Sequence, residues 1–315
     1  MISVILPTRN PHPGRLHRTL AGLAAQSLAR AHWELLIVDN GSEPALATVG
    51  EPLLSALGAR LVTEPEPGLT SARLAGICAA GGDILVFVDD DNVLAATYLA
   101  SVAERFAAAP ALAAASGPVV PEWETPPPAW TREFHGLLAL RDLGPEPRLA
   151  RGGPGTPWPD FAPVGAGLAI KRSHALAYAD AVARDPRRLA LDRTGACLAS
   201  GGDNDLVFTA LHAGGNVAYF PELRLTHLIP AGRLDAVYLA RLNRGIMRTW
   251  VRVLALHGQF PWPRIAPATV PLRVARAWVR LRAWRGPAEK VRWAGARGQF
   301  EGQAEIDTRP SGADR

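Results

Sequence analysis

Short apolar runs alternate with segments of helical periodicity over the first 120 residues. Four runs rich in β-branched and aromatic residues predict strands, at Ile2–Leu6, Leu35–Val38, Arg60–Thr63 and Ile84–Val88. Helices are predicted between them, at Gly14–Leu28, Ala45–Leu57 and Ser71–Ala80. This alternation, with short connections, predicts an α/β fold with a parallel central sheet and right-handed crossovers.

The pattern is less regular after residue 108. A helix over Ala96–Ala108 and a strand over Leu112–Val120 precede long loops rich in Pro, Gly and Trp, which extend to about residue 159. Such loops are often binding loops or lids, and their tryptophans either stack on a sugar or only pack the loop. The run Phe161–Ile170 predicts a strand entered through two glycines, and a further helix opens at Gly202.

Two basic segments with helical periodicity follow residue 228. Tryptophans and arginines interleave in Leu234–Leu256 and Leu272–Trp293. This pattern fits an amphipathic helix lying on an anionic membrane, or a helix that covers the core with solvated arginines. We therefore predict a main domain at 1–228, with halves at about 1–120 and 121–228, a basic helical extension at 229–301 and a disordered tail at 302–315.

Composition narrows the range of protein classes and partners that fit this chain. The 315 residues are 48% hydrophobic with a formal charge of +5, which fits a globular protein and an anionic partner such as a phosphorylated substrate, a membrane surface or nucleic acid. Two cysteines, Cys78 and Cys197, are too few for a disulfide framework or a zinc site. Without a signal peptide or a spanning apolar stretch, we predict a cytoplasmic location.

Three consecutive carboxylates, Asp89–Asp91, follow the apolar strand Ile84–Val88. Like charges placed together need a cation, and Mg2+ is usually held by one or two carboxylates plus substrate phosphates. Since ligands bind beyond the carboxyl ends of parallel strands, Thr8, Arg9 and Asp39 should lie at the same edge. Taken alone, Asp89–Asp91 fits a solvated turn and Asp39 fits an Asx turn. No G-x-G-x-x-G follows the first strand and no Walker A motif is present, which argues against a dinucleotide-binding Rossmann domain and a P-loop ATPase.

The order and spacing of these motifs resemble those of the family 2 glycosyltransferases of GT-A fold, over about residues 1–228. The matching segments are Ser3–Asn10, Leu36–Ser42, Gly68–Gly76, Val88–Asp91, Gly165–Gly167, Gly202–Leu206 and His227. The resemblance implies a mixed or parallel sheet flanked by helices and an inverting transfer from a nucleotide-sugar donor, with UDP the commonest nucleotide.

The resemblance also implies roles for individual residues. The nucleotide sugar would be bound by Pro7, Thr8, Arg9, Asp39, Gly68, Arg73, Asp89 and Asp90. Mg2+ or Mn2+ would be held by Asp91 and His227, although a lone His at a strand end is more often structural. The acceptor side would comprise Gly165, Ala166, Gly167 and Asp205. Asp203 would be the catalytic base, although an acid there is also an ordinary N-cap. The sequence departs from the family at Gly202, where Glu is usual, which leaves Asp205 as a second candidate base.

These features predict an enzyme of cell-surface glycan, lipid-linked glycan or polysaccharide synthesis. Its partners would be a nucleotide-sugar donor, a glycan or lipid-linked acceptor and, through the C-terminal Arg/Trp helices, the inner face of the membrane. Two alternatives remain: a sugar-phosphate nucleotidyltransferase, which would release pyrophosphate, and a non-catalytic protein that binds membrane or nucleic acid.

Overall fold

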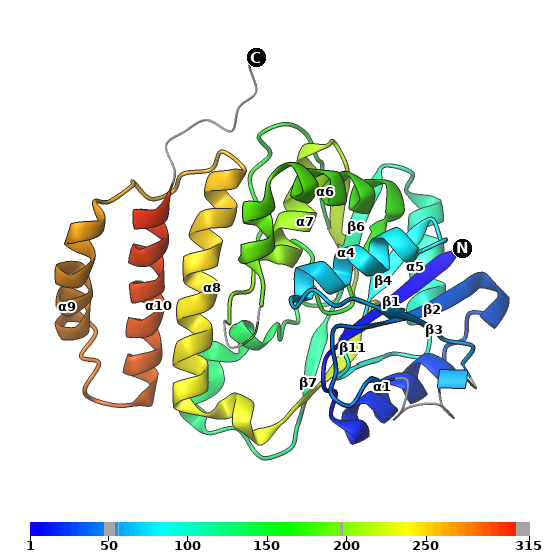
Figure 1. The fold of residues 1–315 in the computed structure, drawn as a ribbon, viewed down its shortest axis with the longest axis horizontal. Helices are drawn as coiled ribbons and strands as arrows, with labels where there is room; N and C mark the ends of the chain where they lie inside the picture. Colours follow the sequence, from blue (N-terminus) through cyan, green and yellow to red (C-terminus); the bar gives the residue numbers. More distant parts are fainter. Residues whose placement is uncertain (47–53, 56, 194, 196–197, 307–315) are drawn as a thin grey trace.

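The computed structural model describes residues 1–46, 54–55, 57–193, 195 and 198–306. Most of the helix predicted at Ala45–Leu57 lies outside the described residues, as do Cys197 and residues 307–315. The fold is mixed α/β, as the sequence pattern predicts (Figure 1).

The main sheet has eight strands in the order β3-β2-β1-β4-β9-β6-β10-β8. Four of them, β3, β2, β1 and β4, are mutually parallel, which confirms the predicted parallel series. Their neighbour β9 is antiparallel to both β4 and β6, so the sheet is mixed. The strands are β1 (Ile2–Thr8), β2 (Trp33–Asp39), β3 (Arg60–Thr63), β4 (Ile84–Phe87), β6 (Leu112–Ser116), β8 (Arg148–Ala150), β9 (Ala169–Lys171) and β10 (Asn216–Tyr219).

Helices cover both faces of this sheet. Alternate residues of β1 point to opposite faces: Val4 and Leu6 pack with α1 (Pro13–Ala24) and α5 (Tyr98–Ala108). Ile5 packs in the core on the other face, which is covered by α4 (Leu69–Ala79), α6 (Arg172–Arg184) and α7 (Gly202–His212). Because both faces are buried, the central strands are continuous apolar runs, which is why the sequence pattern identifies them.

A smaller three-stranded sheet lies beside the carboxyl end of β4. It has the order β5-β11-β7, with β5 (Asn92–Leu94), β7 (Val119–Trp123) and β11 (Leu225–Ile229). This sheet carries His227, which pairs with Asn92 in the β-ladder and is therefore next to the acidic turn.

Two predicted strands are shorter than the apolar runs suggest. The predicted strand Leu112–Val120 is broken at Gly117 and Pro118 into β6 and β7, which belong to different sheets. A Cβ at Gly117 would lie 2.3 Å from the Leu223 carbonyl oxygen, and Pro118 has no N–H to donate. Of the predicted strand Phe161–Ile170, only the end is extended, because Gly167 turns the chain with φ of +70°.

Three helices form a row at one end of the molecule, with α9 outermost (Figure 1). They are α8 (Ala236–Leu256), α9 (Val270–Arg280) and α10 (Pro287–Glu305). The segment predicted as one helix at Leu272–Trp293 is therefore two helices, separated by residues 281–286. Within the described residues, no helix is both long and apolar enough to cross a bilayer.

The predicted disorder is wrong for residues 302–306, where α10 continues to Glu305. A Cβ at Gly298 would lie 2.1 Å from the Arg244 carbonyl oxygen, so only glycine lets α10 approach α8 this closely. Glu301 forms an ion pair with Arg244 at 2.7 Å, and Glu305 pairs with Arg248 of α8. The end of α10 is held by close packing and charge, which a low hydrophobic content does not reveal.

Helix α8 also belongs to the core of the main domain. Its residues Val253 and Leu254 are buried with α6 and α7, and Trp250 packs against the same cluster. Its N-terminal half packs with the short helices η2 (Ala129–Leu138) and η4 (Ala231–Leu234). The extension predicted from residue 229 therefore shares its core with the sheet domain.

Candidate active site

A cavity of about 340 Å³ opens at the carboxyl ends of β1 and β4. Thr8 of β1 is paired with Asp39 of β2, and Ile5 with Phe87 of β4, so the three strands end at one edge. Helix α7 and strand β11 complete the walls. Twelve residues predicted from the sequence line this cavity: Pro7, Thr8, Arg9, Gly68, Arg73, Asp89, Asp90, Asp91, Gly165, Ala166, Asp203 and His227.

The three aspartates that follow β4 lie in different electrostatic surroundings. Burial raises the pKa of Asp89, an effect that Arg73 only partly offsets. Burial likewise raises the pKa of Asp90 to about 6, although the Thr8 hydroxyl donates a hydrogen bond to its carboxylate. For Asp91, burial is outweighed by His227 and Arg233, which hold the pKa below its ordinary value. Asp91 is therefore the most readily ionised of the three.

Asp91 and His227 face each other across the cavity floor, with Asp91 Oδ2 and His227 Nε2 3.4 Å apart. The other ring nitrogen, Nδ1, lies 3.1 Å from the Leu138 carbonyl oxygen. A carbonyl can only accept, so Nδ1 carries a proton and, in the neutral ring, Nε2 presents its lone pair towards Asp91. Two acceptors that face each other need a cation or a shared proton between them.

This pair fits a divalent metal ion that is completed by a ligand. An oxygen from Asp91 and a nitrogen from His227 are ordinary ligands of Mn2+, and the hydrogen bond to Leu138 orients the imidazole as is typical of metal-binding histidines. No cluster of three or more His, Cys, Asp or Glu ligands occurs among the described residues. Substrate oxygens would therefore have to supply the remaining ligands, as they do in many Mg2+ sites.

Arg73 forms a buried ion pair on the opposite side of the acidic turn. Its Nη1 donates to Asp192 Oδ2 at 3.0 Å, and both side chains are almost completely buried. Arg73 also interacts electrostatically with Asp203 and Asp89. Burial raises the pKa of Asp192 to about 6, even though Arg73 acts in the opposite direction. Arg73 thus interacts with carboxylates from three different segments of the chain, Asp89, Asp192 and Asp203.

Asp203 is placed at the cavity wall by the first turn of α7. Its Oδ2 accepts a hydrogen bond from the Gly165 backbone N–H at 2.8 Å. A Cβ at Gly165 would lie 2.8 Å from both Asp203 Oδ2 and Arg73 Nη2, so a side chain there would displace the carboxylate. Gly165, in the glycine loop predicted on the acceptor side, therefore positions the Asp203 carboxylate.

Asp192 also explains the unusual Gly202. A Cβ at position 202 would lie 2.6 Å from Asp192 Oδ2 and 2.8 Å from Thr70 Oγ1. The space that a Glu side chain would need at position 202 is thus occupied by a carboxylate from a different part of the chain.

Asp39 lies beside the cavity but does not line it. Its carboxylate accepts hydrogen bonds from the backbone N–H groups of Ser42 and Leu46, both at 2.9 Å. Burial opposes ionisation, but the Ser42 hydroxyl together with these backbone N–H groups holds the pKa of Asp39 below its ordinary value. The neighbouring Asn40 lines the cavity instead. The arrangement matches the Asx-turn interpretation of Asp39, and its predicted contact with a nucleotide stays a prediction.

Asp205 and Gly167 also lie outside the cavity. Asp205 is completely buried, and its Oδ1 is shared between Arg188 and His257, with His257 Nε2 at 2.7 Å. This carboxylate joins α7 to the end of α8, so the predicted acceptor-side role of Asp205, and its candidacy as the base, are not supported. The carbonyl oxygen of Gly167 accepts a hydrogen bond from the buried Tyr98 hydroxyl. This bond anchors the glycine loop to α5.

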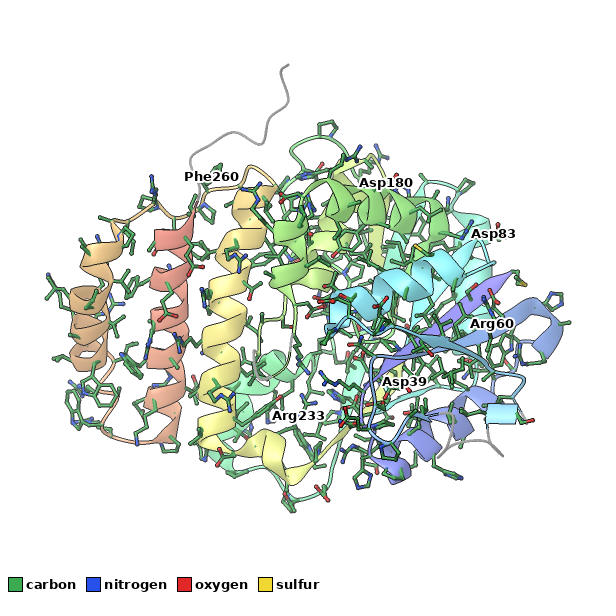
Figure 2. All side chains as sticks on the ribbon, viewed as in Figure 1. Asp39, Arg60, Asp83, Asp180, Arg233 and Phe260 are labelled. Carbon is green, nitrogen blue, oxygen red and sulfur yellow. The ribbon has the colours of Figure 1, made fainter. Side chains whose placement is uncertain are left out.

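Four polar residues of the cavity were not identified from the sequence. Figure 2 shows one of them, Arg233, on the segment that leads from β11 into α8. Its Nη2 lies 3.9 Å from Asp91 Oδ2. The others are Asp192, Arg193 and Ser200. Asp192, Arg193 and Ser200 come from irregular segments and Arg233 from the short helix η4, where no periodicity or motif marks them.

Comparison with known sequences identifies relatives. The sequence model of the family described as "Glycosyl transferase family 2" matches residues 3–177. The succinoglycan biosynthesis protein ExoM of Rhizobium meliloti is 28% identical over 246 residues, which cover 76% of this chain and 71% of ExoM. The glycosyltransferase AglE of Haloferax volcanii is 29% identical over 92 residues, which cover 29% of this chain and 30% of AglE.

Solved structures share the fold over nearly the whole chain. The mannosyltransferase PcManGT from Pyrobaculum calidifontis, in complex with GDP-Man and Mn2+, aligns with a TM-score of 0.53 at 19% identity, covering 94% of this chain and 73% of that one. TarS 1-349 of S. aureus in complex with UDP aligns with a TM-score of 0.52 at 13% identity, covering 95% of this chain and 89% of that one. These similarities confirm the GT-A fold predicted from the sequence motifs.

Proposed function

Because the chain belongs to glycosyl transferase family 2, we propose that its cavity transfers a sugar from a nucleotide-diphosphate donor to a hydroxyl acceptor with inversion at the anomeric carbon. The observation that carries the proposal is that Asp203 and the Asp91–His227 pair line one cavity. A polysaccharide or its lipid-linked precursor is the proposed product, by analogy with ExoM.

The donor's nucleotide would lie at the edge formed by β1, β2 and the start of α4. Arg9 is exposed at the cavity wall, and Asn40 fixes the loop to Gly68 by donating to the Glu66 carbonyl oxygen at 2.7 Å and accepting from Gly68 N–H at 2.8 Å. The complexes of TarS with UDP and of PcManGT with GDP-Man support a nucleotide-sugar donor. We propose a UDP-sugar, with GDP-sugars to be tested beside it.

Asp91 and His227 would hold a divalent cation, Mg2+ or Mn2+, together with oxygens of the donor diphosphate. Such an ion supplies Lewis-acid stabilisation of the charge that develops on the leaving diphosphate. The Mn2+ in the PcManGT complex supports this assignment. Arg233, close to Asp91, adds a fixed positive charge at the same place.

Asp203 would act as the general base. Its carboxylate accepts the proton of the acceptor hydroxyl while that oxygen attacks the anomeric carbon, and the bond between this carbon and the diphosphate oxygen breaks. The bonding electrons leave with the nucleoside diphosphate. A single displacement of this kind inverts the configuration. Arg73, which interacts electrostatically with both Asp203 and Asp192, supplies a fixed positive charge beside the base.

The test is an analysis of products with the full chain. Incubation with UDP-GlcNAc, UDP-glucose or GDP-mannose, Mn2+ and candidate acceptors should release a nucleoside diphosphate and form a glycoside of inverted configuration, read by NMR. The alternative nucleotidyltransferase would instead use a nucleoside triphosphate and release pyrophosphate. Retention of configuration would refute the single displacement, and pyrophosphate release would refute glycosyl transfer.

A further inference from the structure

The outer side of α9 carries exposed apolar side chains. Leu272 and Val279 are 65% and 64% exposed, and their spacing of seven residues places them on one side of the helix with Pro271 and Ala275. On the opposite side of the helix, Ala277 is buried. We call Pro271, Leu272, Ala275 and Val279 the apolar stripe. In the described part of the chain, nothing covers this stripe.

Unpaired arginines border the apolar stripe. Arg273, Arg276 and Arg280 are exposed on the adjacent side of α9, and Arg282 and Arg285 follow it. None of these five forms an ion pair with a described residue. Each acidic residue of α10 already has a basic partner: Glu289 pairs with Arg292, Glu301 with Arg244 and Arg297, and Glu305 with Arg248. The charge on this surface therefore has no counterion within the structure.

The positive charge of the chain is concentrated in this region. Residues 229–306 contain 13 Arg and one Lys against four acidic residues, a formal charge of +10 in a chain whose total is +5. Trp284, 55% exposed, extends the apolar surface beyond the end of α9. Tryptophan beside arginine and aliphatic residues is typical of a surface in contact with lipid headgroups.

The contacts that attach α9 to α10 leave the apolar stripe and its bordering arginines exposed. Trp278 packs edge-on against Trp293 of α10, with ring centroids 4.9 Å apart, and Trp293 Nε1 donates to the Val274 carbonyl oxygen at 3.1 Å. An open groove of about 640 Å³ runs along the same junction, lined by Pro271, Ala275 and Val279 of the apolar stripe. In Figure 1, α9 is the outermost element at this end of the molecule.

We propose that α9 docks the protein on an anionic lipid bilayer, with the apolar stripe and Trp284 inserted at the headgroup boundary and the bordering arginines on lipid phosphates. Charge complementarity favours this partner. A second copy of the same surface would place arginines against arginines, and nucleic acid would leave the aliphatic residues Leu272 and Val279 without a partner. The inference goes beyond the proposed transfer reaction and does not depend on it.

Vesicle sedimentation tests the proposal with the full chain. Vesicles of phosphatidylcholine alone are compared with vesicles that contain 30% phosphatidylglycerol, at about 50 mM and 500 mM NaCl. We expect sedimentation with the anionic vesicles at low salt and little with neutral ones. We also expect weaker binding at high salt, because exposed charges are screened.

Two double variants separate the contributions of charge and apolar contact. Arg276→Gln with Arg280→Gln should weaken binding to anionic vesicles about 25-fold, at about fivefold for each arginine near the surface. Leu272→Ser with Val279→Ser should weaken it about tenfold. The matched controls make the same substitutions at exposed residues outside α9: Arg151→Gln with Arg184→Gln, and Leu61→Ser with Leu149→Ser. Both controls should bind as the unchanged protein does.

Several results would overturn the proposal. They are no sedimentation with anionic vesicles, equal binding to neutral and anionic vesicles, or equal losses in the α9 variants and their controls. Dimerisation that the Leu272→Ser/Val279→Ser variant abolishes, without vesicle binding, would assign the surface to a second copy. A salt-sensitive complex with DNA or RNA, without vesicle binding, would assign it to nucleic acid. Because the readout is lipid binding, failure here leaves the proposed transfer reaction untouched.

Discussion

At the residue scale, neighbouring polar residues have different functions because they point in different directions. Asp39 is the last residue of β2 and binds backbone N–H groups, whereas Asn40, the first residue after the strand, lines the cavity. Residues two apart on a helix lie about 200° apart, so Asp203 faces the cavity while Asp205 is buried against His257. Sequence motifs locate such pairs, but motif matching alone does not choose between the two members.

Asp203→Asn should abolish sugar transfer and leave donor binding intact. The amide keeps the size of the side chain but cannot take the proton of the acceptor hydroxyl. We expect kcat to fall by about 100- to 10,000-fold, the usual contribution of a general base. Steady-state kinetics and calorimetric titration of the nucleoside diphosphate measure the two properties separately.

The matched control is Asp180→Asn, on α6, where the side chain is exposed (Figure 2). This variant should have the activity of the unchanged protein. Transfer at an undiminished rate in Asp203→Asn would remove Asp203 from the mechanism.

Asp192 should make the stability of the protein depend on pH. Because burial raises its pKa from 3.8 to about 6, the folded state binds more protons than the unfolded state between these values. Protonated Asp192 therefore contributes stability that is complete below pH 3.8 and is lost as the pH rises through 6. Asp192→Asn has no such dependence. The advantage of the unchanged protein over this variant in unfolding free energy should thus fall by about 2 kcal/mol between about pH 4.5 and 7.

Urea unfolding of both proteins at the two pH values measures this difference. A difference that does not change with pH would mean that the Asp192 carboxyl titrates as it does in water.

At the scale of elements, the buried strands were predictable because each is a short apolar run enclosed on both faces. Helix α10 was less visible in the sequence. Its contact with α8 uses Gly295, Gly298 and Gly302 in place of large apolar residues, so the packing leaves little hydrophobic periodicity. The division of the predicted strand at Gly117 depends on a close approach to Leu223, which is distant in sequence.

Gly298→Leu should destabilise the protein by separating α8 from α10. A Cβ there would already lie 2.1 Å from the Arg244 carbonyl oxygen, which belongs to the backbone and cannot turn aside. We expect a loss of roughly 1–3 kcal/mol of unfolding free energy, typical of overpacking. Thermal and urea unfolding measure it. The control, Gly136→Ala, adds a Cβ where nothing lies within 4 Å and should change little. Equal stability of both variants would contradict the close contact of the helices.

At the scale of the whole molecule, motifs in the first 228 residues were sufficient to predict the fold class and most of the cavity. They could not predict that the C-terminal helices share the same core. That arrangement depends on contacts such as Trp250 against Phe208, at 6.3 Å between ring centroids, which join residues of different predicted units. Arg233 reaches the cavity for the same reason.

A chain that ends at residue 228 should therefore fold poorly. Its truncation exposes the surface of α7 that Trp250, Val253 and Leu254 cover, and removes His257, one of the two partners of Asp205. We expect loss of cooperative unfolding or a fall in Tm of more than about 10 °C by circular dichroism. A chain that ends at residue 306 is the control for shortening. If the chain of 228 residues unfolds at the same temperature as this control, the extension is an independent unit.

The most direct test of the central claim is the binding of a nucleoside diphosphate with and without a metal ion. Isothermal titration of UDP, and of GDP, should show binding that requires Mn2+ and is lost with a chelator. It should weaken at least about tenfold in Asp91→Asn and in His227→Ala, because each removes a proposed metal ligand. The Asp180→Asn control should bind as the unchanged protein does. Binding of equal affinity with chelator, or in both ligand variants, would contradict a metal-assisted nucleotide-sugar site at the end of β4.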